Sequence, residues 1–119
     1  MIEIIRSFPK QIREAFEFPV YNLDIKTIDR IIICGMGGSA IAGDLIKSYL
    51  YNIPIPIEVI RDYTVPKYIS SKTIAFIVSY SGNTEETISA FNEVFKIGSR
   101  IIIITSGGKL KEIAENYKI

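Results

Sequence analysis

The run Arg30–Cys34, in which three isoleucines precede a cysteine, is the feature that most constrains the fold. It is too short for a helix and apolar at both odd and even positions, which is typical of a central strand in a parallel sheet. Pro54 and Pro56 place the start of a second strand at a sheet edge or a strand entrance. We predict the further strands at Ile55–Ile60, Thr73–Val78 and Arg100–Ile104.

Segments with helical periodicity alternate with these strands. We predict helices at about Ser7–Phe18, Ser39–Leu50, Glu85–Lys96 and Lys109–Tyr117. The alternation predicts an α/β fold with a doubly wound parallel sheet and right-handed crossovers, a flavodoxin-like three-layer sandwich. The chain stops just after its last helix, where open parallel sheets often carry a fifth strand, so we expect the last strand to be lacking. We expect one domain over residues 1–119, with an N-terminal helix at about 1–18 and a core at about 30–119.

The spacing of apolar residues predicts which helix faces are buried. Pro9 falls in the opening turn of the first helix, where a missing N–H costs little, and Gly98 closes the third helix. The third helix is expected to bury Ile88, Phe91 and Phe95. In the first helix Ile12, Ala15 and Phe16 share one face, and in the second Ile41, Leu45 and Tyr49 have helical spacing.

Composition excludes several classes of function. Fourteen basic against thirteen acidic residues give a net charge of +1 without a basic block, so nucleic acid is a poor partner. The apolar runs are too short to span a bilayer, and the N-terminus lacks the charge layout of a signal peptide, so we expect no membrane contact and a cytoplasmic location. The single cysteine, Cys34, cannot form an internal disulfide and is read as a small buried side chain. Because the chain has no histidine, any chemistry must use carboxylates or residues from another chain.

Two turns between a strand and a helix carry groups that suit an anion. The first is Gly35–Ala40, in which glycines allow close approach of the backbone and Ser39 begins the helix. The second is Ser79–Thr84, in which three hydroxyls surround one glycine. Free amides of a helix's first turn and the helix dipole favour negative charge, and ligands of open α/β sheets bind beyond the carboxyl ends of strands. These turns predict a phosphate site at that edge.

Other interpretations of these segments exist. Gly35, Gly37 and Ala40 fit the dinucleotide pattern G-x-G-x-x-A, with Asp62 near the expected acidic position. Asn83 and Glu86 have the spacing of a capping box. The structural alternative to a phosphate-binding role for Ser39 is that of a plain N-cap. Thr105–Lys109 lacks the spacing of a phosphate loop and is read as a loop with a helix start. Arg61–Pro66 either lines the pocket rim or forms a surface connection.

The strings Gly35–Ala40 and Ser79–Thr87 together resemble the sugar isomerase (SIS) domain, and more narrowly the N-terminal half of bifunctional phosphoglucose/phosphomannose isomerases. Arg61–Tyr63 with Pro66, and Thr105–Leu110, are similar to the same family. The resemblance implies that the substrate phosphate is bound by Ser39, Ser79, Ser81 and Thr84, with Gly37 and Gly38 as backbone contacts.

The resemblance also implies an activity that interconverts glucose 6-phosphate or mannose 6-phosphate with fructose 6-phosphate through an enediol, without a metal or redox cofactor. The family's catalytic glutamate and histidine belong to later segments that this chain lacks, so it implies a fragment of a two-domain enzyme that anchors phosphate. It further implies a homodimer or pairing with a second SIS domain. The rival interpretation is a non-catalytic module that senses sugar phosphates.

Overall fold

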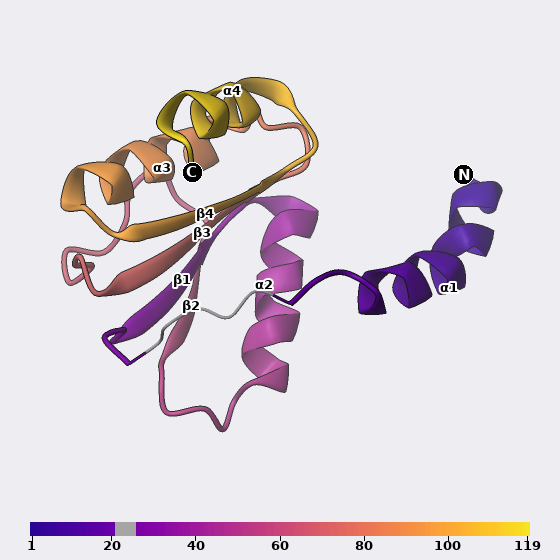
Figure 1. Ribbon diagram of the computed structural model, residues 1–119, viewed down its shortest axis with the longest axis horizontal. Coiled ribbons are helices and arrows are strands. Elements are labelled where there is room, and N and C mark those ends of the chain that lie inside the picture. The colour runs from indigo at the N-terminus through magenta and orange to yellow at the C-terminus, as the bar shows by residue number, and fades with distance from the viewer. Residues whose placement is uncertain (21–25) are drawn as a thin grey trace.

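Four parallel strands form the middle layer of the protein (Figure 1). The computed structural model describes residues 1–20 and 26–119. The strands are β1 (Arg30–Cys34), β2 (Ile57–Ile60), β3 (Thr73–Ser79) and β4 (Arg100–Thr105), and their order in the sheet is β2-β1-β3-β4. Because the chain moves from β1 to β2 on one side and to β3 on the other, the order reverses between β1 and β3. At such a switch point the crossovers diverge beyond the strands' carboxyl ends.

The flanking helices complete the expected three layers. α2 (Gly37–Tyr49) covers one face of the sheet, while α3 (Glu85–Ile97) and α4 (Gly108–Tyr117) cover the other (Figure 1). The main core lies between the sheet and the α3–α4 layer, where Ile32, Ile77, Phe91, Val94 and Leu110 are buried. α3 ends at Gly98 in the left-handed conformation, as predicted. The doubly wound α/β fold is therefore confirmed. The expectation that the sheet lacks its last strand stays a prediction.

The apolar residues with helical spacing in α2 do not mark its buried face. Ile41, Leu45 and Tyr49 are exposed, and the residues that α2 buries are Ala40 and Gly43. The physical reason is the close approach of the helix to the sheet, because a Cβ at Gly43 would lie 3.0 Å from Ile33 Cγ2. Small residues permit this approach, and the spacing of apolar residues alone does not indicate it. In α3 the prediction is right for Phe91, whereas Phe95 is 42% exposed.

α1 (Ile2–Phe16) begins earlier than predicted, so Pro9 lies inside the helix instead of in its opening turn. None of its residues is buried, and it projects away from the sheet (Figure 1). The predicted face with Ile12, Ala15 and Phe16 is therefore exposed in this chain. Among residues 1–20 and 26–119, no helix has the length and apolar character needed to cross a bilayer.

Candidate functional site

The first turn presents open backbone at the start of α2. α2 begins at Gly37, and its N-cap is Met36, so Ser39 is an early helical residue and not the cap. Gly37 has φ +50°, and added Cβ atoms at Gly37 or Gly38 would meet nothing within 4 Å. Because this backbone is uncovered, a ligand can approach its amides directly. The Ser39 side chain is half-buried, and its amide donates to the Met36 carbonyl at 3.1 Å.

The second turn holds its hydroxyls in two different positions. Ser79 is the last residue of β3 and is buried, and its Oγ lies 2.9 Å from Thr84 Oγ1. The Gly82 amide donates to Ser79 Oγ at 3.1 Å. Ser81 is exposed, and its Oγ accepts a hydrogen bond from the Asn83 amide at 3.2 Å. The structure therefore brings Ser79 and Thr84 together, while Ser81 faces outward from the same turn.

α3 begins without the predicted capping box. Its N-cap is Thr84, not Asn83, and the Thr84 side chain makes no capping hydrogen bond. Asn83 Oδ1 instead accepts a hydrogen bond from the Lys109 amide at 3.0 Å, at the start of α4. Because Thr84 makes no capping hydrogen bond, the first amides of α3 remain available beside the Thr84 hydroxyl. Glu85 and Glu86 lie in this first turn, where acidic side chains interact favourably with the helix dipole.

The two turns lie against each other at the switch point between β1 and β3. A Cβ at Gly35 would be 2.9 Å from the Val78 carbonyl oxygen and 3.1 Å from Ser39 Cβ, so only glycine fits without a shift. A depression of about 920 Å³ opens beside this contact. Its wall includes Gly38, Ser39 and Tyr80. The other proposed site residues of the two turns, Gly37, Ser79, Ser81 and Thr84, do not line it. The full lining is Phe18, Met36, Gly38, Ser39, Val78, Tyr80, Ile104, Thr105 and Ser106.

The third turn, Thr105–Lys109, contacts the second turn through its backbone. α4 begins at Gly108, which confirms a loop with a helix start. The Ser106 amide and hydroxyl both donate to the Tyr80 carbonyl, at 3.2 Å and 2.6 Å. No local pattern beyond the pair of glycines indicates this contact, because the partners are far apart along the chain.

The segment after β2 lies beside the middle of α2 and the start of α3. Arg61 forms an ion pair with Asp44 of α2. The charge of Glu86, with smaller effects of burial and of Glu85, raises the pKa of the Tyr63 phenol. Arg61, Asp62 and Thr64 line a separate hollow of about 370 Å³. The segment thus joins α2 to α3 outside the depression that holds Ser39.

A further carboxylate, Glu58, lies away from this edge, and the thiol of Cys34 is buried. Glu58 pairs with Arg30, the first residue of β1, and accepts a hydrogen bond from Tyr68, so its carboxylate is engaged near the strand starts. Cys34 is buried, and burial raises the pKa of its thiol to about 12, in line with a packing role. Within the described part of the chain, no group of three His, Cys, Asp or Glu side chains is placed to hold a metal.

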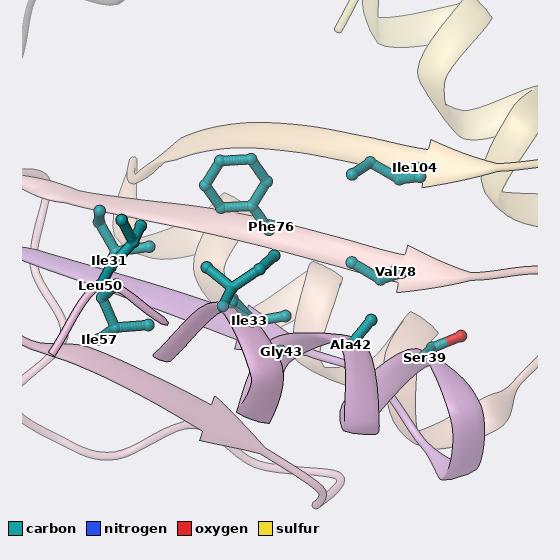
Figure 2. A pocket seen from close by; sticks show the side chains of 11 residues that line it. Ile31, Ile33, Ser39, Ala42, Gly43, Leu50, Ile57, Phe76, Val78 and Ile104 are labelled. Atoms are coloured by element: carbon teal, nitrogen blue, oxygen red, sulfur yellow. The ribbon is translucent and has the colours of Figure 1, made fainter. Parts of the chain in front are cut away.

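A second, apolar groove of about 340 Å³ runs along the face of the sheet beside α2 (Figure 2). Ile33, Phe76, Val78 and Ile104 form its wall, and Ser39 lies at one end with its hydroxyl directed away from the apolar side chains. With almost no polar lining, this groove does not suit a phosphate.

Comparison with known proteins places this geometry in a family. The SIS domain model matches residues 24–116. A bifunctional phosphoglucose/phosphomannose isomerase of Caldicellulosiruptor bescii is 45% identical over 97% of this chain and 35% of its own length. A D-glucosamine-6-phosphate 4-epimerase of Sulfolobus acidocaldarius is 45% identical over 77% of this chain and 29% of its own length. The chain thus spans about a third of these relatives.

Among solved structures, the Vibrio vulnificus NanR protein complexed with ManNAc-6P superposes with a TM-score of 0.61 at 22% identity. The match covers 75% of this chain and 36% of that protein, and at this identity it supports the fold. The family model and the relatives above 30% identity carry the assignment further: the chain belongs to the SIS domain family.

Proposed function

We propose that this chain is the phosphosugar-binding domain of an aldose–ketose isomerase that interconverts glucose 6-phosphate or mannose 6-phosphate with fructose 6-phosphate. Its part is to anchor the phosphate through Ser39, Ser79, Ser81 and Thr84, with the backbone of Gly37 and Gly38 completing the site. The anchored sugar is then held so that a base from elsewhere in the protein removes a proton beside the carbonyl, which gives an enediol. This route moves only protons, so the proposal includes no metal or redox cofactor.

The observation that carries the proposal is the contact of the two turns at the switch point. The Gly35 backbone packs against the end of β3, which places two helix N-termini and a group of hydroxyls at one sheet edge. Uncovered amides at Gly37 and Gly38 and the hydroxyl pair of Ser79 and Thr84 are donors of the kind that bind a compact dianion. A phosphate bound there would compete with the Ser79–Thr84 hydrogen bond and with the bond between Ser81 and the Asn83 amide.

The rest of the proposed protein supplies what the chain lacks. The relatives are about three times longer, and the catalytic glutamate and histidine are expected in their remaining length. We propose pairing with a second SIS domain or a second copy, and a cytoplasmic location. The 45% identity to an epimerase that is named for a different reaction is consistent with a domain that binds phosphosugars while other segments determine the chemistry.

The Ser81 hydroxyl provides the direct test. Ser81→Ala should weaken binding of fructose 6-phosphate about tenfold or more, because a hydrogen bond to a charged group contributes roughly 1.5–3 kcal/mol. Stability should change little, since the side chain is exposed. Isothermal titration calorimetry gives the affinity, and thermal denaturation gives the stability.

Ser48→Ala is the matched control, because Ser48 is exposed on α2 away from the turn. It should leave both quantities unchanged. A Ser81→Ala protein that binds fructose 6-phosphate as tightly as the parent would show that the phosphate lies elsewhere.

A second candidate is a module that senses sugar phosphates without turning them over. It is favoured by the absence of histidine from the 119 residues. Turnover in a coupled isomerase assay on the chain would exclude a sensor, and it would also contradict a domain that only anchors the phosphate. Stabilisation by NAD and by no sugar phosphate would instead support the dinucleotide pattern of Gly35, Gly37 and Ala40.

A further inference from the structure

The N-terminus of α4 is engaged by the second turn of the site. The Lys109 amide donates to Asn83 Oδ1 and the Leu110 amide donates to the Gly82 carbonyl, both at 3.0 Å. Amides at a helix start usually lack partners and so form anion sites. Here their acceptors come from the segment between Ser79 and Thr84, so the dipole of α4 acts on the backbone of that turn.

A second pair of hydrogen bonds fixes the turn at its middle. Ser106 donates from both its amide and its hydroxyl to the carbonyl of Tyr80, the residue between Ser79 and Ser81. The Thr105 hydroxyl donates to the Gly107 carbonyl at 2.8 Å and accepts from the Gly107 amide at 3.3 Å. The third turn is thus stabilised by its own hydrogen bonds. It is also hydrogen-bonded to Tyr80, which connects two proposed phosphate ligands, Ser79 and Ser81.

The two turns also approach more closely than side chains permit. A Cβ at Gly108 would lie 2.2 Å from the Ser81 carbonyl oxygen, and a Cβ at Gly82 would lie 1.8 Å from the Gly107 carbonyl oxygen. Both glycines have positive φ, +67° and +69°. A larger residue at either position must therefore displace the backbone that carries Ser81.

We propose that Thr105–Lys109 is a brace that sets the positions of the phosphate-binding hydroxyls, with Ser106 and Gly108 as positioning residues. The brace rests on the proposed function, because it acts through Ser79, Ser81 and Thr84. It also gives the glycine-rich third turn a role other than a separate phosphate loop. Displacement of the turn should misplace the donors and weaken sugar-phosphate binding, even where the domain stays folded.

Neighbouring glycines give a matched set of variants for the test. Gly108→Ala introduces both positive-φ strain and the clash with Ser81, and it should raise the Kd for fructose 6-phosphate about tenfold or more. Gly107→Ala lies in the same turn at φ 169° with open space around its Cβ, and should bind like the parent. Gly98→Ala carries the strain of φ +79° without a neighbour within 4 Å, so it should lower the melting temperature alone.

Ser106 keeps the test decisive if Gly108→Ala fails to fold. Ser106→Ala removes one of the two bonds to the Tyr80 carbonyl and should raise the Kd about threefold to tenfold, as expected for one hydrogen bond. Ser106→Thr retains the hydroxyl and should restore the parent affinity. Affinities are measured by calorimetry for fructose 6-phosphate and for inorganic phosphate, and melting temperatures are recorded for every variant.

The outcomes separate the brace from the proposed function. If the parent binds neither fructose 6-phosphate nor inorganic phosphate, the proposed function fails and the brace fails with it. A parent that binds, together with Ser106→Ala and Gly108→Ala proteins of parental affinity, overturns the brace alone. Loss of affinity in Ser106→Ala at an unchanged melting temperature, with recovery in Ser106→Thr, supports it.

Discussion

Thr87 has a buried hydroxyl that finds no hydrogen-bond partner among the described residues. The residue lies in the first turn of α3 and is 2% exposed. A buried hydroxyl without a partner carries its full cost of desolvation. Thr87→Val should therefore stabilise the protein by about 1 kcal/mol or more, because it keeps the branched shape and removes the unpaired oxygen. Chemical denaturation measures the change in the free energy of unfolding.

Thr87→Ser is the matched control, because it keeps the hydroxyl and removes the methyl group, and should destabilise the protein by about 1 kcal/mol. A Thr87→Val protein less stable than the parent would mean that the hydroxyl has a favourable partner. If that variant also bound fructose 6-phosphate more weakly, Thr87 would belong with the neighbouring Thr84 in the site.

Among the structural elements, α4 offers a test of its cap. Asn83 caps it from another turn, through the bond between Oδ1 and the Lys109 amide. Loss of such a cap costs about 1 kcal/mol, so Asn83→Ala should lower the free energy of unfolding by that amount. Asn83→Asp keeps the acceptor and should be nearly as stable as the parent. Asn52→Ala, in the exposed turn after α2, should have no comparable effect. Equal stability of the Asn83→Ala and parent proteins would contradict the cap.

The sequence was informative where one local pattern decides the structure. The continuous apolar runs identify β1, β3 and β4, and Gly98 ends α3, because an apolar run and a positive φ each leave a local signature. Patterns could not identify Asn83 as a cap of α4 or Gly43 as the point of closest approach of α2. Those roles depend on elements that are distant along the chain.

For the candidate site, the sequence patterns identify the two turns, and the structure places both at one sheet edge. Strand alternation does not distinguish the buried Ser79 from the exposed Ser81, since residues two apart in a strand point to the same side. The chain leaves its regular strand after Ser79, so the alternation stops there. Whether these residues bind phosphate stays a prediction.

At the scale of the whole molecule, the accessible surface is larger than mass alone requires. The chain exposes 8599 Å², whereas a compact monomer of 13.4 kDa is expected to expose about 6,500 Å². On α1, Ile5, Phe8 and Ile12 share one exposed apolar face that contributes to this surface. A standard interface buries about 800 Å² per partner, so the excess is enough for the proposed pairing.

We therefore expect the chain to self-associate, and expect Phe8→Ser with Ile12→Ser to shift it toward the monomer. Both changes remove apolar surface from the same helix face without altering the core. Sedimentation velocity over a range of concentrations measures the association. Glu14→Ser, on the opposite face of α1, is the control and should sediment like the parent. A parent protein that stays monomeric at all concentrations would contradict this self-association.

β4 carries a further consequence for handling the protein. It contains four consecutive isoleucines, it pairs with β3 on one side, and no described strand pairs with its other side. A hydrophobic strand with unpaired backbone groups is a template on which strands of other molecules can add, which leads to aggregation. Ile104 is 53% exposed on this strand, so a lysine there would act as a gatekeeper that makes strand addition costly.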